Sequence, residues 1–389
     1  MSELKVNSIK GTGASTAAIT IDSSSGGCSA NITNNLTNRR LTINGAMTVA
    51  QRGTSSTSSG YQTLDRFKLL YDNITNSPTQ AQVDVASGTT PYTLGFRKAL
   101  KITNGDQTIG ADDRLRLQHV LEAQDIANSG WNYTSTSSYI TLSFWIKSSV
   151  AQNFFIRLQT QDGTTQNYVV ETGSLTADTW TKITKSIPGN SNLQFDNDND
   201  AGLLIDFGPF YGTNFTGTRP LNAWAAYDGA TRFPNFTTTW FDTNDATLEI
   251  TGVQLEVGSV ATDFEHRVFN EELRLCERYF HMSYNTGRAI GSTGSGGNLQ
   301  HNGTNNHAGT CQMNLNFPVE MRANPTLVAY SGDTGNSGNW TGTSNSAGLG
   351  DRSTTFYLTN TKRTSIYINT GGSRVACGLT GQYTADAEL

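Results

Sequence analysis

Charged side chains are scarce in this chain of 389 residues: they make up 15% of it, where soluble proteins commonly carry about 25%. No run of lysine or arginine occurs and the formal net charge is −5, which excludes an extended track for nucleic-acid phosphates. No apolar run reaches the ~18 residues of a membrane-spanning helix, and the opening MSELKVNSIKG lacks the apolar stretch of a signal peptide. The sequence therefore predicts synthesis in the cytoplasm, no membrane insertion and no nucleic-acid partner.

Cysteine is rare as well, and its spacing carries no metal or redox signature. No CxxC pair occurs among the four positions, which are Cys28, Cys276, Cys311 and Cys377. This scatter argues against a zinc site and against a disulfide framework. It fits folding in a reducing cytoplasm.

Small polar residues and aromatics replace the missing charges. The chain has 39 Gly, and its 17 Phe, 14 Tyr and 6 Trp are too many for a wholly disordered protein. Thr and aromatics suit pleated surfaces, whereas Gly and Asn suit turns. The composition therefore predicts short strands with many turns, in a chain long enough for about two to three domains.

Alternation of apolar residues marks the clearest strands. In YITLSFWIKS one face carries only apolar residues and the other carries Trp145, the apolar set being Ile140, Leu142, Phe144 and Ile146. In TLEITGVQLEV the apolar phase slips at Thr251-Gly252, which predicts a β-bulge. LTINGAMTVAQRG reads as two strands around a turn at Asn44-Gly45.

One segment, FNEELRLCERYFHM, predicts a helix of about three turns. Asn270 can cap it, Glu271 and Glu272 fall in its first turn, and apolar residues recur on one stripe. The segment is too short for an independent coiled coil, so we expect it to pack on a sheet or around a trimer axis.

The predicted fold is therefore all-β, a jelly-roll sandwich plus a smaller C-terminal β-domain with one short helix between them. We expect the sandwich over residues 41–265, the helix or neck over 266–283, and the C-terminal domain over 284–389. Residues 1–40 bury too little alone and predict an anchor completed by another chain; a flexible leader is the alternative.

Catalytic motifs are present only as fragments. Asp206-Phe207-Gly208 spells a kinase metal motif without the Gly-rich loop, strand lysine or HRD segment that it needs. Glu249 and Glu256 fall in different strand phases, which makes them a poor pair for glycan hydrolysis. No fixed-period repeat of a depolymerising β-helix occurs. We expect no enzymatic activity and no catalytic residues.

Two clusters resemble metal sites. Asp196, Asp198 and Asp200 alternate as at the start of a calcium loop, so a structural calcium ion could bind there, although an EF-hand is excluded because Phe207 stands at the twelfth position. A solvated acidic turn is the alternative. His301 and His307 could share an ion on a trimer axis or could be solvated loop residues. No other cofactor is expected.

Aromatic residues in polar surroundings are the candidate ligand-binding residues, because a flat ring can stack on the C–H face of a sugar. Trp145 lies opposite the apolar stripe of its strand. The other candidates lie in irregular or Gly/Ser/Asn-rich stretches and are Trp224, Tyr227, Trp240 and Trp340. The alternative is that these rings fill the core or a trimer seam.

The order of several segments carries a family resemblance. LTINGAMTVAQRG, YQTLDRF, LSFWIKS and ITGVQLEVGSVATDFEHR resemble the carbohydrate-binding jelly-roll domains of phage tail fibres. FNEELRLCERYF, NFPVEMRANPTLVAYS and the closing YTADAEL are similar to tail and fibre proteins of phages that infect marine bacteria and cyanobacteria. The resemblance covers roughly residues 41–389.

This resemblance implies a virion protein, assembled as a homotrimer, that contacts a host-surface glycan. We expect the N-terminal segment to join phage tail or adaptor proteins, and the aromatic-bearing loops to meet the receptor. Two alternatives stay open: a head-decorating or tail-bracing structural protein without receptor binding, and a glycan-degrading spike.

Overall fold

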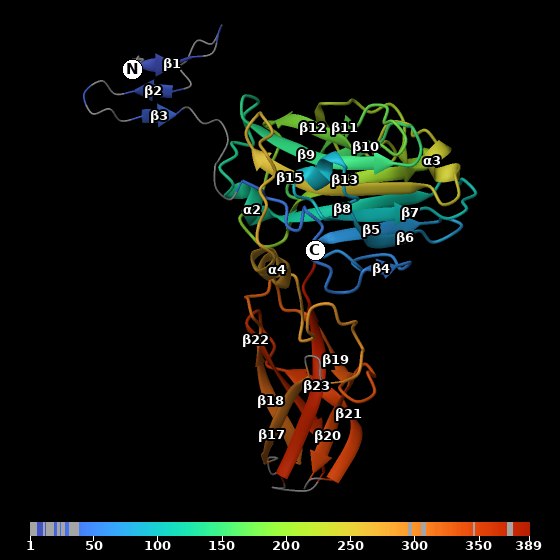
Figure 1. Ribbon diagram of the computed structural model, residues 1–389, viewed down its shortest axis with the longest axis vertical. Helices are drawn as coiled ribbons and strands as arrows, with labels where there is room; N and C mark the ends of the chain where they lie inside the picture. Colours follow the sequence, from blue (N-terminus) through green and yellow to red (C-terminus); the bar gives the residue numbers. More distant parts are fainter. Residues whose placement is uncertain are drawn as a thin grey trace.

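The computed structural model describes residues 6–10, 12, 19–21, 24, 28–30, 39–294, 298–304, 309–344, 347–371 and 376–389. Figure 1 shows a broad sandwich, an elongated β unit below it, and a short helix beside the connection between them. Across the described ranges, no helix is long and apolar enough to cross a membrane.

The sandwich consists of two six-stranded antiparallel sheets. We call the first one sheet I; in spatial order it contains β12 (Thr181–Pro188), β9 (Tyr139–Ser148), β15 (Thr247–Val257), β7 (Lys98–Thr103), β6 (Thr79–Asp84) and β4 (Ser55–Ser56). Sheet II contains β14 (Trp224–Ala226), β11 (Gln166–Glu171), β10 (Phe155–Thr160), β13 (Ala201–Tyr211), β8 (Arg114–Glu122) and β5 (Phe67–Asp72). The strand order crosses repeatedly between distant parts of the sequence, as in a jelly roll.

The predicted alternation along β9 is confirmed. Its four apolar residues are buried, and they pack in one continuous core with apolar residues of sheet II. Phe144 of sheet I meets Phe207 of sheet II edge to face, with ring centroids 5.1 Å apart. The two sheets therefore face each other across this core, and the predicted all-β jelly-roll fold is confirmed.

The predicted β-bulge in β15 is also confirmed. The register between β15 and β9 shifts between Thr251 and Gln254, and Gly252 has φ +64°. Glycine adopts this left-handed conformation without the Cβ clash that other residues meet.

The predicted hairpin at residues 41–53 is wrong. No strand forms there, because the Asn44 side chain satisfies the main chain locally: it accepts hydrogen bonds from the N–H groups of Thr48 and Val49 and donates to the carbonyl oxygens of Val49 and Asp65. Such side-chain bonds compete with a strand ladder.

The predicted helix exists as α4 (Phe269–Glu277), but it is shorter than expected. Val268 precedes it in an extended conformation, so Asn270 lies inside the helix and does not cap it. The end of the predicted segment, Phe280–Met282, forms strand β16 instead, because it pairs with the long strand β23 (Ala376–Asp386). The three other described α-helices are single turns: α1 (Thr90–Thr93), α2 (Ala123–Ala127) and α3 (Thr239–Asp242).

The lower unit is an eight-stranded antiparallel arrangement, sheet III, centred on β23. Its other strands are β16, β17 (Leu299–Thr304), β18 (Thr310–Asn316), β19 (Thr326–Ser331), β20 (Asn339–Ser344), β21 (Ala347–Tyr357) and β22 (Arg363–Asn369). A disulfide joins Cys311 of β18 to Cys377 of β23 across its own core. The sequence argued against a disulfide framework and did not predict this single bridge, because a separation of 66 residues gives no spacing signal.

The described N-terminal residues form a separate three-stranded sheet, which Figure 1 shows away from the sandwich. Its strands are β1 (Ser8–Ile9), β2 (Ile19–Ile21) and β3 (Cys28–Ala30). Ile9 of β1 is 53% exposed, whereas Ile19 and Ile21 of β2 are half-buried.

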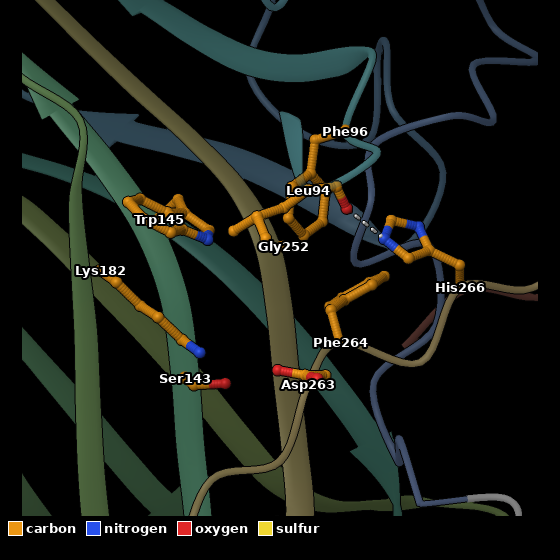
Figure 2. Close-up of a pocket in the computed structure, with 9 residues that line it drawn as sticks. All are labelled: Leu94, Phe96, Ser143, Trp145, Lys182, Gly252, Asp263, Phe264 and His266. Atoms are coloured by element: carbon orange, nitrogen blue, oxygen red, sulfur yellow. Dashed lines mark hydrogen bonds between the residues drawn. The ribbon is translucent and has the colours of Figure 1, made fainter. Parts of the chain in front are cut away.

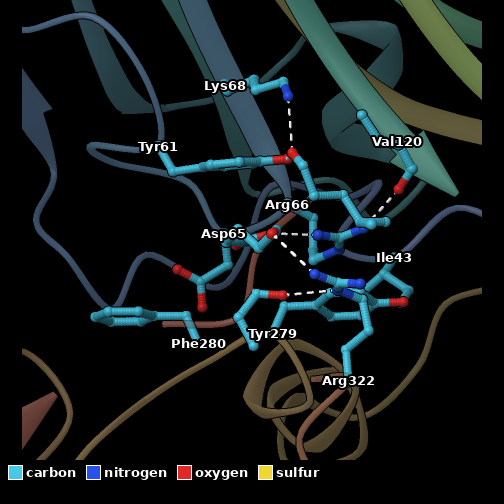
Figure 3. Close-up of polar contacts among 12 residues, drawn as sticks. Ile43, Tyr61, Asp65, Arg66, Lys68, Val120, Tyr279, Phe280 and Arg322 are labelled. Carbon is cyan, nitrogen blue, oxygen red and sulfur yellow. Dashed lines mark hydrogen bonds and ion pairs between the residues drawn. The ribbon is translucent and has the colours of Figure 1, made fainter. Parts of the chain in front are cut away.

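The end of the chain returns to the sandwich at the junction between the two units, where it meets Tyr61, Arg66 and Lys68, which Figure 3 shows. Glu388 pairs with Arg52 and Arg66, and the Arg66 guanidinium lies 3.3 Å from the centre of the Tyr279 ring. The main-chain oxygen of Leu389 accepts hydrogen bonds from Lys68, at 2.7 Å, and from Tyr61.

A second ionic contact lies beside it. Glu122 accepts hydrogen bonds from Nε and Nη2 of Arg278, at 2.7 and 2.8 Å, and from the Tyr279 hydroxyl. Burial alone would raise the pKa of Glu122, but these hydrogen bonds together hold it below its ordinary value. Arg322 of the lower unit donates to the carbonyl oxygens of Ala387 and Asn199, so one network joins sandwich, helix region and lower unit.

Candidate binding pocket

A pocket of about 220 Å³ opens on the outer face of sheet I (Figure 2). It combines aromatic rings, one cation and one carboxylate, and its lining consists of Leu94, Phe96, Ser143, Trp145, Lys182, Gly252, Asp263, Phe264 and His266. Trp145 is the predicted ligand-binding residue that lies here.

The strands position the first part of this pocket. Because the apolar residues of β9 point into the core, Ser143 and Trp145 point outward. Lys182 of β12 stands directly opposite Trp145 in the antiparallel register. Aromatic ring and ammonium group are therefore neighbours on one sheet face.

The bulge in β15 makes room for the rings. A Cβ atom on Gly252 would lie 2.7 Å from Cζ of Phe96 and 3.2 Å from Cδ1 of Trp145. The first distance is shorter than any ordinary carbon contact. The glycine therefore allows Phe96 and Trp145 to approach the same stretch of main chain.

Three rings form the opposite wall. The centroids of Phe96, Phe264 and His266 lie 4.9 to 5.0 Å from one another. Nε2 of His266 donates to the carbonyl oxygen of Leu94, 2.9 Å away, which fixes the imidazole against the end of α1. The wall is thus held by ring contacts and one hydrogen bond.

Polar groups at the mouth are free to bind a ligand. Lys182 and Asp263 are exposed, and within the described ranges neither side chain has a hydrogen-bond or ion-pair partner. An apolar ring beside free donors and acceptors can stack on one face of a sugar and hydrogen-bond its hydroxyls.

The sequence singled out Trp145 as a ligand-binding residue and Gly252 at the bulge, but it gave no such role to Phe96, Lys182, Asp263, Phe264 or His266. Three of these belong to the segment ATDFEHR, which is part of the family resemblance. A signal was therefore present in that segment, whereas Phe96 and Lys182 reach the pocket only through strand pairing.

Two predicted ligand residues lie elsewhere on the sandwich. Trp224 is half-buried at the start of β14, where its indole N–H donates to the carbonyl oxygen of Pro188 at 2.7 Å. Its ring lies 5.2 Å from that of Tyr168. Tyr227 is 39% exposed on the side of sheet II. The structure does not bring either residue to the Trp145 pocket.

Two other predicted ligand-binding residues, Trp240 and Trp340, were predicted wrongly, because both rings are completely buried. Trp240 lies in α3, packs against Phe154, and donates its N–H to the carbonyl oxygen of Thr247. Trp340 was expected at an exposed loop tip, but it lies in β20 and donates to the carbonyl oxygen of Gln382. Each indole N–H is satisfied inside the protein, so neither ring can meet a sugar.

The acidic turn is exposed, as Asp196, Asp198 and Asp200 all lie at the surface. Burial and the negative charges of these residues raise the pKa of neighbouring Asp162, although an N–H donated by Asp196 opposes the shift. Among the described side chains, no group of three or more acids, histidines or cysteines is arranged to hold a metal ion. The calcium ion stays a prediction; His301 lies in β17, and His307 lies outside the described residues.

Comparison with known proteins gives structural similarities only. No family model and no curated protein matches this chain. One similar structure is the enzymatically active domain of tailspike protein 4 of bacteriophage CBA120, with 10% identity and a TM-score of 0.30; the match covers 56% of this chain and 21% of that chain.

Carbohydrate-binding modules are also similar. The N-terminal cellulose-binding domain of β-1,4-glucanase C from Cellulomonas fimi has 9% identity and a TM-score of 0.27, with 55% of this chain and 100% of that chain covered. The CBM22-1 xylan-binding domain from Paenibacillus barcinonensis has 10% identity and a TM-score of 0.25, with 54% and 94% covered. These scores are low, so the fold class and the site rest on the strands and side chains described above.

Proposed function

We propose that this chain is a structural protein of a bacteriophage particle, a homotrimeric tail fibre or spike that recognises a glycan on the host surface. The single observation that supports glycan recognition is the Trp145 pocket, where aromatic walls adjoin the free polar groups of Lys182 and Asp263. The family resemblance of the sequence supports the virion location.

In this proposal the sandwich binds sugar without cleaving it. Residues 1–40 join the protein to phage tail or adaptor proteins. Weak binding by one pocket gains strength because three copies act together at high effective concentration.

Binding to host polysaccharide tests the recognition step. Trp145→Ala should weaken affinity by about tenfold, because a lost ring contact of about 1.4 kcal/mol corresponds to that factor. Trp180→Ala is the matched control: this half-buried tryptophan immediately precedes β12, lies beside Lys147 and does not line the pocket. Equal affinity of the Trp145 variant and the wild type contradicts the proposed site, and a shortened polymer contradicts binding without cleavage.

Assembly and location need separate measurements. Light scattering should give three times the chain mass of 42.0 kDa. Gold-labelled antibody against the C-terminal residues should mark the tips of tail appendages. Label spread over the head overturns the tail-fibre assignment and favours a head-decorating protein.

A further inference from the structure

A second cavity, of about 260 Å³, lies on the outer face of sheet II, on the side of the sandwich away from the Trp145 pocket. Its floor spans the four strands β5, β8, β10 and β13. Lys68, Gln118 and Arg157 face outward into the cavity because they alternate with residues of the buried core. Its rim comes from the loop after β14, which contributes Tyr227 and Arg232.

Strand register aligns the floor. Lys68 of β5 pairs with Gln118 of β8, Gln118 pairs with Asp206 of β13, and Asp206 pairs with Arg157 of β10. Neighbouring strands are about 4.8 Å apart, so these side chains form one row across the sheet.

Positive charge predominates in this cavity. Its lining contains four cations and no Asp or Glu side chain; the cations are Lys68, Arg116, Arg157 and Arg232, and Leu389 lines the cavity as well. Asp206 pairs with Arg157 at 2.8 Å, and Asp72 is shared by Arg116 and Arg114. Within the described ranges no Asp or Glu side chain forms an ion pair with Lys68 or Arg232. Lys68 donates a hydrogen bond to the main-chain oxygen of Leu389 at 2.7 Å, so Arg232 is the lining cation that has no anionic partner among the described residues.

Arg157 brings buried donors without a hydrogen-bond partner to this cavity. Its side chain is only 4% exposed, and its Nε and Nη1 atoms are buried without a hydrogen-bond partner. Leaving a buried charged donor unsatisfied costs more than about 1–3 kcal/mol, so such groups normally have a partner. Burial also lowers the pKa of Lys68, a shift that a bound anion would reverse.

The remaining lining suits a sugar. Gln118, Gln159 and Gln161 present amides that can bind hydroxyl groups, and Tyr227 offers a partly exposed ring. The cavity volume of about 260 Å³ lies just below the usual range of ligand pockets, about 300–1,000 Å³, and therefore suits one charged ring better than a continuous backbone.

We propose that this cavity binds the carboxylate or sulfate group of an acidic polysaccharide. The saccharide part of the proposal rests on the glycan recognition proposed above, but the site is distinct from the Trp145 pocket. A nucleic-acid backbone is disfavoured because the cations converge on one cavity and form no track.

The experiment titrates the full chain with four probes: a polyuronate, a sulfated dextran, neutral dextran of the same length, and single-stranded DNA. Either acidic polysaccharide should bind at least tenfold more tightly than neutral dextran, and the one preferred identifies the anionic group. Affinity should fall as salt rises from about 50 to 200 mM. Equal binding of neutral dextran, or tighter binding of DNA, overturns the proposal.

Variants separate this site from the Trp145 pocket. Arg232→Gln should weaken acidic-polysaccharide binding at least fivefold, while Lys362→Gln, which removes the same charge from an exposed position of the lower unit, should change nothing. Loss of acidic binding in Trp145→Ala, with Arg232→Gln unaffected, overturns the second site and leaves the proposed function intact. The reverse result supports the second site, and the Trp145 pocket is then tested separately by the binding of host polysaccharide to Trp145→Ala.

Discussion

A buried carboxyl group beside the junction makes stability depend on pH. Burial raises the pKa of Asp65 to about 6, although Arg52 and hydrogen bonds from Gln51 oppose the shift. A raised pKa means that the folded state holds the proton more tightly than the unfolded state. This contribution is fully present below pH ~4 and is lost as pH rises through about 6.

Asp65→Asn should remove this dependence. A difference of about two pKa units corresponds to about 3 kcal/mol, so the free energy of unfolding of the wild type should fall by up to that amount relative to the variant between pH 4 and 7. Urea unfolding at several pH values measures the difference. If the difference in the free energy of unfolding between the two proteins does not change with pH, the prediction is contradicted.

Gly252 allows a second prediction at residue scale. Gly252→Ala adds both left-handed strain and a clash with Phe96, so we expect a loss of about 1–3 kcal/mol in unfolding free energy. Gly130→Ala is the control, because Gly130 has φ +86° with open space around its Cβ position. Equal losses in the two variants indicate that the contact with Phe96 matters little.

Individual aromatic residues show where sequence reasoning ends. Alternation along β9 placed Trp145 outside correctly, because the period of a strand fixes the direction of its side chains. Trp340 lies among Gly, Ser and Asn, which predicted a loop, yet β23 supplies both a pairing strand and a Gly381 that leaves space for the indole. Burial that depends on a distant strand leaves no local pattern.

At the scale of elements too, features that follow from local periodicity were predicted correctly, and features that depend on distant segments were not. The strand β9 and the bulge in β15 follow from local periodicity, and both were predicted. The segment 41–53 was not, because the side chain of Asn44 and contacts with Val253 replace a hairpin ladder. The pocket residues Phe96 and Lys182 likewise become neighbours of Trp145 only through pairing of distant strands.

The ion pairs of Glu388 with Arg52 and Arg66, which we call the C-terminal clasp, can be tested. Glu388→Gln leaves Arg66, which is 1% exposed, without its carboxylate, and breaking such a buried pair costs about 3–5 kcal/mol. Chemical denaturation measures the loss. Glu320→Gln, which breaks an exposed pair with Lys362, should leave stability unchanged; a similarly small effect at Glu388 contradicts the clasp.

At the scale of the whole molecule, the two largest apolar cores, one in the sandwich and one in the lower unit, predict two unfolding transitions. The disulfide belongs only to the lower core, and closing a loop of 66 residues stabilises it by about 4 kcal/mol. The double variant Cys311→Ala/Cys377→Ala should lower one calorimetric transition and leave the other in place. Cys276→Ala, which removes a buried free cysteine, controls for loss of sulfur alone. A joint shift of both transitions shows that the junction couples the two cores.

The clasp also sets an order of events during protein synthesis. Glu388 follows Arg66 by 322 residues, which a ribosome needs roughly 15 to 60 seconds to add at about 5–20 residues per second. Throughout that interval the nascent sandwich holds the Arg66 guanidinium without this carboxylate. The corner where the sandwich meets the lower unit therefore closes only after β23 has left the ribosome.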